Sequence, residues 1–141
     1  KGSAVLENWL VEETGLAEAS FRVADGSGLS RYNMITPEGT TRVLRRMWAH
    51  PSRQEYLDSL PVAGVDGTLA YRMRETAAAQ NVFAKTGTMT GVSCLSGYVR
   101  NAGGRWLGFS ILCNGYVGSS GGARSLQDEL CILMAESDQP E

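Results

Sequence analysis

A lysine, a threonine and a glycine stand next to each other at Lys85, Thr86 and Gly87, inside a run of residues that favours a β-strand. The lysine ammonium and the threonine hydroxyl can both donate hydrogen bonds to a carboxylate. The glycine leaves the backbone open, because it carries no side chain that would keep a ligand away. Together these residues could hold a carboxylate against the edge of a sheet. On spacing alone, an ordinary solvated lysine is the more common explanation.

The triplet lies in the first of three segments that predict β-strands, at residues 82–88, 92–100 and 105–114. Only a short turn separates the first two segments, so we expect them to pair in antiparallel fashion, since a parallel crossover needs a dozen or more residues. The glycine-containing loop 101–104 predicts a second hairpin. Both alternating sets of side chains in the third segment are largely apolar or small, which indicates a sheet covered on both faces.

Helical periodicity predicts the elements that would cover this sheet, at residues 3–13, 37–49 and 123–136. The apolar residues of the last helix, expected to face the sheet, are Leu126, Leu130, Ile132, Leu133 and Met134. Shorter elements are predicted at 21–23 (a strand), at 52–60 (a helix that begins with a capping box, Ser52 to Glu55) and at 69–73 (a short helix). The predicted fold is α/β, with an antiparallel sheet flanked by helices.

Composition narrows the class of protein. The chain has 141 residues, 43% of them hydrophobic and 20% charged, which is typical of a globular domain rather than a disordered or fibrous chain. The net charge is −2, and no basic cluster is interleaved with aromatic residues, so a nucleic-acid partner is not indicated. No apolar run is long enough to span a membrane. The length of the chain, 141 residues, therefore predicts a single domain, because two complete domains would not fit.

Other reactive side chains are few. The three cysteines lack the spacing of a zinc site and are expected to pack as small hydrophobic residues, with a Cys94–Cys113 disulfide as the alternative to packing. The single histidine, His50, precedes a proline at a helix end, where capping or solvation explains it. A Ser-His-Asp hydrolase has little support, and neither a metal site nor a cofactor is indicated. A solvated helix face is expected from Arg42, Arg45 and Arg46.

Stretches far apart in the chain strengthen the interpretation of the triplet. They are Val23-Ala24-Asp25-Gly26-Ser27-Gly28-Leu29-Ser30-Arg31, Leu60-Pro61-Val62-Ala63-Gly64-Val65-Asp66-Gly67-Thr68-Leu69, Ala84-Lys85-Thr86-Gly87-Thr88, Gly91-Val92 and Leu95-Ser96-Gly97-Tyr98-Val99. Their order resembles the carboxy-terminal half of D-alanyl-D-alanine carboxypeptidase/endopeptidases, the class C low-molecular-mass penicillin-binding proteins. The resemblance covers roughly residues 1–135. It is far more specific than the triplet alone.

This resemblance implies a serine peptidase of the cell envelope, periplasmic or extracellular. Such an enzyme attacks D-alanyl-D-alanine ends or cross-links of peptidoglycan through an acyl-enzyme, which β-lactams mimic. The implied fold is part of a penicillin-binding-protein/β-lactamase-like domain. Its sites combine Ser-x-x-Lys, Ser-x-Asn and Lys-Thr-Gly, and only the third is found here, because no serine is followed by lysine three positions later. We therefore expect the other two motifs upstream of Lys1, and we expect this chain alone to be inactive.

The resemblance also implies roles for single residues. Lys85 would supply positive charge and a proton-relay contact, and the Thr86 hydroxyl would bind the substrate carboxylate. Gly87 would let the substrate backbone approach closely. The backbone N–H of Thr88 would be one of two donors to the oxyanion. Lys85 and Thr88 are thus the predicted catalytic residues of this half of the site.

The glycine-rich loop 25–31 has two interpretations. In one, it is a turn satisfied by the Asp25 side chain. In the other, implied by the resemblance, the loop with Gly28 borders the substrate cleft and Arg31 pairs with an acidic group of the stem peptide. Met89 could line the same cleft or simply pack.

Two alternatives to a peptidase remain. A non-catalytic module that binds peptidoglycan or a protein partner would keep the carboxylate-binding triplet without the serine. A β-lactamase relative is less favoured, because residues 25–30 resemble the peptidase group instead. For the peptidase, the expected partners are peptidoglycan stem peptides, β-lactams and the amino-terminal part of the same domain.

Overall fold

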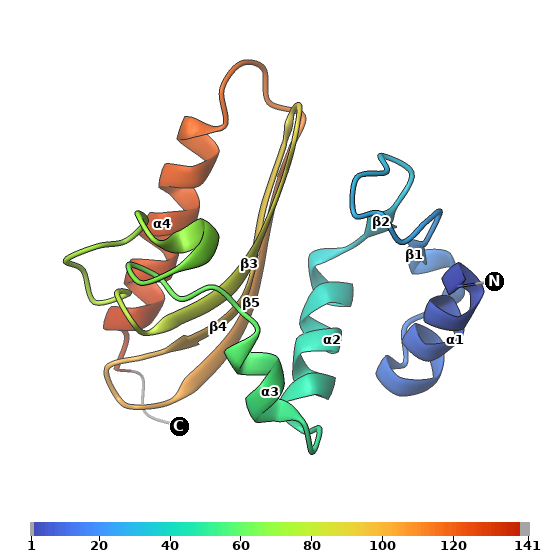
Figure 1. Cartoon of the computed structure of the whole chain (residues 1–141), viewed down its shortest axis with the longest axis horizontal. Coiled ribbons are helices and arrows are strands. Elements are labelled where there is room, and N and C mark those ends of the chain that lie inside the picture. Colours follow the sequence, from blue (N-terminus) through green and yellow to red (C-terminus); the bar gives the residue numbers. More distant parts are fainter. Residues whose placement is uncertain (1, 139–141) are drawn as a thin grey trace.

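A computed structural model of the chain describes residues 2–138 and has a three-stranded antiparallel sheet at its centre. The strands are β3 (Val82–Met89), β4 (Val92–Arg100) and β5 (Trp106–Asn114), in the order β3-β4-β5. Helix α4 (Gly121–Glu136) lies against one face of the sheet, and α2 (Pro37–Trp48) lies against the other (Figure 1). The predicted α/β fold and both predicted hairpins are confirmed.

The elements that precede α2 or directly follow it lie on the same side of the sheet as this helix (Figure 1). Helix α1 (Gly2–Thr14) packs on α2, and a ribbon of β1 (Phe21–Arg22) and β2 (Met34–Ile35) lies between these helices in the chain. The sequence predicts the first strand of this ribbon but not its partner. A short helix, α3 (Arg53–Asp58), follows α2. None of the described helices is long and apolar enough to cross a membrane.

Local chemistry sets where α2 begins and how the chain turns into α3. The Thr36 hydroxyl accepts a hydrogen bond from the Gly39 N–H at 3.0 Å, and Pro37 occupies the first helical position, where its missing N–H costs nothing. The predicted capping box of α3 is wrong, because the Ser52 side chain makes no capping bond. Instead, the Ser52 N–H donates to Nδ1 of His50 at 3.1 Å. The single histidine therefore holds the turn between the two helices.

One predicted helix is reduced to a single turn. The chain forms a 3-10 turn at Gly67–Leu69 and then continues irregularly. Met73, Glu75 and Gln80 have φ angles of 57°, 58° and 62°, which a right-handed helix does not allow. Leu69 is nevertheless fully buried, so the turn is anchored against the sheet.

The core is divided between the two faces of the sheet. On the α4 face, Val82, Leu95 and Val99 are completely buried. Each side chain of this size contributes about 1.5–3 kcal/mol when it leaves water. On the α2 face, an aromatic cluster forms around Tyr98, whose ring centroid lies 5.3 Å from that of Trp48. The prediction that both faces are covered is confirmed.

Tyr98 also fixes α2 on the sheet. Its hydroxyl donates to the carbonyl oxygen of Leu44 at 2.6 Å, and its side chain is almost fully buried. Burial raises the pKa of Tyr98 well above its usual range, because the charged phenolate would lose its hydration. The tyrosine therefore stays neutral and keeps donating at any physiological pH.

The predicted orientation of α4 is partly wrong. The residues of α4 that are buried are Gln127, Cys131 and Ala135. Three residues that were expected to face the sheet are instead 49%, 37% and 62% exposed: Leu126, Leu130 and Leu133. The buried stripe follows spacings of four residues, as one face of a helix does. The two other predicted residues, Ile132 and Met134, pack partly buried against the core.

A buried polar network explains this orientation. Nε2 of Gln127 donates to the carbonyl oxygen of Ser93 on β4 at 3.0 Å, and Oε1 of Gln127 accepts from Arg72 at 3.1 Å. Arg72 also forms an ion pair with Asp128 at 2.7 Å. A buried amide without partners would cost about 1–3 kcal/mol, so this stripe of α4 is held on the sheet once the network forms.

Two of the exposed leucines border the free edge of β5. Leu130 and Leu133, together with Leu107, Phe109 and Ile111, line a groove of about 540 Å³. Within residues 2–138, β5 has no strand partner on this side. That an amino-terminal part of the same domain completes the sheet here stays a prediction, and this groove is the surface that such a part would cover.

All three cysteines are free. In the register of β4 and β5, Cys113 lies opposite Ser93, whereas Cys94 lies opposite Leu112. The side chains of Cys94 and Cys113 therefore point to opposite faces of the sheet, because successive residues of a strand alternate. The disulfide alternative is wrong for this geometry. Cys131 is fully buried in the core, as expected for a packing residue.

Candidate functional site

The Lys-Thr-Gly triplet lies on β3, at the outer edge of the sheet. A loop covers the first half of this edge, up to Ala84, whose N–H donates to the carbonyl oxygen of Pro61 at 3.0 Å. Backbone groups alternate in direction along an antiparallel strand, so the N–H groups of Thr86 and Thr88 point the same way as that of Ala84. No described residue pairs with either of them. The open edge of the sheet therefore begins at the triplet.

Lys85 is exposed and bends back over this edge. Its Nζ donates to the carbonyl oxygen of Thr86 at 2.7 Å, which places the ammonium charge beside the outward-pointing backbone groups. Across the sheet Lys85 lies opposite Ser96, but the Ser96 hydroxyl bonds to that of Ser110 at 2.9 Å. Among residues 2–138, Lys85 has no serine partner. The edge thus carries a cation and free donors, which suits an anion with an extended backbone.

Thr86 turns its side chain to the opposite face from Lys85, because the two are neighbours on a strand. Its hydroxyl donates to the Thr68 hydroxyl at 2.9 Å. Thr68 lies in the 3-10 turn that Leu69 anchors, and it is exposed. Sequence reasoning did not identify Thr68 as a site residue, although it lies within one of the stretches that carry the family resemblance. Only the fold brings it to the triplet, across 18 residues of chain.

Gly87 is exposed, and nothing in the described chain requires a glycine there. A Cβ atom at this position would lie 3.6 Å from the Cβ of Cys94, an ordinary contact, and the backbone is not in the left-handed region. Gly97, on the neighbouring strand, is different. A Cβ there would lie 2.6 Å from the Cα of Ala84 and even closer to the carbonyl oxygen of Phe83. Gly97 thus serves strand packing, whereas the space at Gly87 is open to a ligand.

Of the remaining predicted residues, Thr88, Met89 and Arg31 lie at or near the end of β3. Thr88 is exposed and Met89 is half-buried, next to a two-residue turn that leads into β4. The Arg31 guanidinium reaches this turn and donates to the carbonyl oxygen of Thr90 at 3.2 Å. Gly28 is exposed with a φ of +71°, and the space beside its Cα is empty. The fold therefore brings Arg31 to the hairpin, but it gives Gly28 no contact with the triplet.

The loop that carries Arg31 is ordered by its own polar side chains. Asp25 accepts hydrogen bonds from the N–H and the hydroxyl of Ser27, at 3.0 and 2.7 Å. These bonds lower the pKa of the Asp25 carboxyl, because they stabilise its charged form. Asn33 closes the loop by accepting from the Ala24 N–H at 2.7 Å. The turn interpretation of Asp25 is thus confirmed, and it is compatible with a loop that also borders a ligand.

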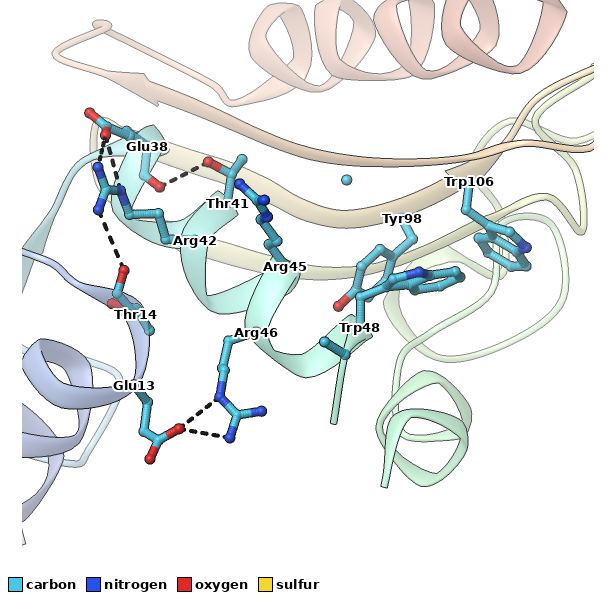
Figure 2. A pocket seen from close by; sticks show the side chains of 12 residues that line it. Glu13, Thr14, Glu38, Thr41, Arg42, Arg45, Arg46, Trp48, Tyr98 and Trp106 are labelled. Atoms are coloured by element: carbon cyan, nitrogen blue, oxygen red, sulfur yellow. Dashed lines mark hydrogen bonds and ion pairs between the residues drawn. The ribbon is translucent and has the colours of Figure 1, made fainter. Parts of the chain in front are cut away.

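A hollow of about 890 Å³ lies elsewhere, between α1, α2 and the strands β4 and β5 (Figure 2). None of residues 85–88 lines it. Two of its arginines are already occupied: Arg46 forms an ion pair with Glu13 at 2.7 Å, and Arg42 donates to the carbonyl oxygen of Gly15 at 3.0 Å. Arg42 and Arg45 are exposed, as expected for a solvated face, but the bonds of Arg42 and Arg46 also fasten α1 to α2. We regard the hollow as a gap beside a structural joint, not as the site of the chemistry.

Comparisons of the sequence and of the structure with known proteins point to one family of peptidases. The model of the D-Ala-D-Ala carboxypeptidase 3 (S13) family matches residues 1–136. The chain is 46% identical over 127 residues to a D-alanyl-D-alanine carboxypeptidase of Actinomadura sp. (strain R39), covering 86% of this chain and 23% of that protein. A crystal structure of penicillin binding protein 4 from Haemophilus influenzae, complexed with a β-lactam, matches with a TM-score of 0.74 and 30% identity, covering 91% of this chain and 31% of that one.

A further structural match extends over almost the whole chain. A predatory endopeptidase from Bdellovibrio bacteriovorus aligns with a TM-score of 0.80 at 21% identity, covering 99% of this chain and 40% of that one, and at this identity the match concerns the fold alone. The chain spans about a quarter of the length of the curated relatives it matches, 23% for both the Actinomadura protein and the D-alanyl-D-alanine carboxypeptidase DacB of Haemophilus influenzae.

Proposed function

Since the chain belongs to the D-Ala-D-Ala carboxypeptidase 3 (S13) family, we propose that the protein it comes from is a serine D-alanyl-D-alanine carboxypeptidase/endopeptidase. It acts on peptidoglycan stem peptides in the cell envelope, periplasmic or extracellular, and it reacts with β-lactams. Residues 1–141 are the carboxy-terminal part of its penicillin-binding domain. They supply the Lys-Thr-Gly half of the active site.

The observation that carries this proposal is the open edge of β3 at the triplet. From Thr86 onward the edge offers outward backbone N–H groups with which no described residue pairs, together with the Lys85 ammonium and the Thr86 hydroxyl. An extended peptide can add to such an edge as a further strand, with main-chain hydrogen bonds that give affinity. A peptide with a free carboxylate, or a β-lactam that mimics it, matches these donors.

In the proposed reaction, each residue at the edge of β3 has one role. The Thr86 hydroxyl and the Lys85 ammonium bind the substrate carboxylate, and Gly87 leaves room for the substrate backbone. The N–H of Thr88 donates to the oxygen that becomes negative when the nucleophile attacks the scissile carbonyl. A fixed donor at that point is worth more in the transition state than in the ground state, because the charge develops only there. Met89 and the Gly28 loop with Arg31 border the substrate beyond the triplet.

The nucleophile lies outside these residues in the proposal. An acyl-enzyme needs a serine activated by a neighbouring base. Ser96, which lies opposite Lys85, is bonded to Ser110 instead of the lysine. The chain matches relatives about four times its length, so there is room for Ser-x-x-Lys and Ser-x-Asn in the remainder of the protein. The 141 residues by themselves are expected to be catalytically silent.

Covalent labelling with a fluorescent penicillin tests whether the nucleophile lies outside these 141 residues. We expect the full-length protein to form a stoichiometric covalent adduct and the 141-residue chain to form none. Reading the gene upstream of Lys1 should find both missing motifs. Labelling of the short chain would contradict the proposed division of the site. A full-length protein that binds peptidoglycan without being labelled would favour the alternative, a non-catalytic binding module. Turnover of penicillin, with rapid release of the acyl group, would favour a β-lactamase relative.

A further inference from the structure

Thr68 is the hydrogen-bond partner of the Thr86 hydroxyl and so affects the direction in which that hydroxyl donates its hydrogen bond. The two side-chain oxygens are 2.9 Å apart, and Thr86 is the donor of this hydrogen bond. The Thr86 proton therefore points to Thr68, not to the open edge. A hydroxyl has one proton and two acceptor positions, so Thr86 cannot donate to Thr68 and to a carboxylate at once.

Hydrogen bonds to backbone N–H groups hold the loop that carries Thr68 in its shape. The Asp66 carboxylate accepts from the Val62 N–H at 2.8 Å, and the carbonyl oxygen of Leu69 accepts from the Gly64 N–H at 3.0 Å. These bonds close the loop on itself. The fully buried Leu69 side chain then anchors it against the sheet beside β3. Thr68 is thus held by a rigid support, although its own side chain is exposed.

We propose that Thr68 is a positioning residue for carboxylate recognition, and that the hydrogen bond between Thr68 and Thr86 reverses when an anionic ligand binds. In the bound state the Thr68 hydroxyl donates to Oγ1 of Thr86, and Thr86 turns its own proton to the carboxylate. No proton is gained or lost, because each hydroxyl keeps its own. A donor that itself accepts a hydrogen bond is polarised and donates more strongly, so the pair binds the anion better than Thr86 alone.

This inference rests on the proposed function, since it assigns a ligand carboxylate to Thr86. It predicts a defect specific to that carboxylate. The probes are benzylpenicillin and its methyl ester, which lacks the charge, and the measured quantity is the ratio of their acylation rates with the full-length protein. Thr68→Val keeps the shape of the side chain and removes the hydroxyl. It should lower the preference for the acid about two- to tenfold, the range for one net hydrogen bond, while the ester reacts as before.

Thr68→Ser is the matched control, because it retains the hydroxyl and should stay within about twofold of the parent. With a peptide substrate, Thr68→Val should raise KM and leave kcat nearly unchanged, as expected for lost ground-state binding. The decisive variant is the double mutant. If Thr68 acts through Thr86, then Thr68→Val should have no further effect in a Thr86→Val background. Thermal unfolding of each variant controls for the fold, and Thr68→Ala serves if the valine disturbs the loop.

The outcomes separate the inference from the function. If the parent prefers the acid and Thr86→Val removes this preference while Thr68→Val does not, the positioning role is overturned and the carboxylate site stands. If the two substitutions have additive effects, Thr68 acts on its own and the inference is wrong. If the parent does not distinguish acid from ester, or is not acylated at all, the carboxylate site itself fails and the inference fails with it.

Discussion

The substitution Gly87→Val tests whether the glycine is required for ligand binding and not for folding. The new Cβ would lie 3.6 Å from the Cβ of Cys94, an ordinary contact, in an extended backbone that any residue adopts. A β-branched residue also suits an exposed strand better than glycine does. We therefore expect the free energy of unfolding of the full-length protein to change by less than about 1 kcal/mol. Its melting temperature should stay within a few degrees.

The effect on acylation should be large, because the added side chain occupies the space through which a ligand backbone would approach β3. Forcing a side chain into an occupied space costs about 1–3 kcal/mol. With tenfold per 1.36 kcal/mol, this predicts an acylation rate with benzylpenicillin that is lower by about 5- to 150-fold. The assay is stopped-flow acylation, run beside thermal unfolding of the same sample.

Gly97→Ala is the matched control on the neighbouring strand. Its Cβ would lie 2.6 Å from the Cα of Ala84, so β3 and β4 would have to separate along backbone atoms that cannot rotate away. We expect a loss of about 3 kcal/mol or more, or no folded protein. Acylation by Gly87→Val at the parental rate would refute the assignment of the open edge as the ligand site. A large fall in its melting temperature would refute the claim that the fold tolerates a side chain there.

Three further substitutions and measurements test other parts of the structure. Arg31→Ala should weaken turnover of stem peptides that carry an acidic group, by about 1.5–3 kcal/mol for a charged hydrogen bond, and barely change the reaction with benzylpenicillin; equal losses on both would mean that its bond to Thr90 merely supports the hairpin. Gln127→Leu should destabilise the protein by about 1–3 kcal/mol in urea unfolding, because it leaves the buried Ser93 without its partner, and unchanged stability would contradict the network. Burial raises the pKa of Cys131 to about 12, so at pH 8 its thiol should resist iodoacetamide in the folded protein and react after unfolding. Mass spectrometry that finds Cys131 modified before unfolding would show that its environment is wrong.

The sequence determined the sheet and the place of the triplet on it. Short connections leave two neighbouring strands only one way to pair, so the turn after Met89 and the loop 101–104 sufficed to predict both hairpins. The same local information located α2, because Thr36 and Pro37 form its start within a few residues. Hydrogen bonds and turns between near neighbours depend on little else than the residues themselves.

The tertiary structure decided which surfaces meet. The last helix carries apolar residues around much of its circumference, so periodicity could not choose among its faces, and the buried bonds of Gln127 made the choice. The pairing of Thr68 with Thr86 depends on how a whole loop docks on β3, and no spacing in the chain encodes it. The outward direction of the Thr86 and Thr88 N–H groups depends on the register of β3 against β4, since a shift by one residue would turn them inward. Contacts between residues far apart in the chain depend on many packing and hydrogen-bond energies together, so local sequence patterns do not predict them and the folded structure is needed.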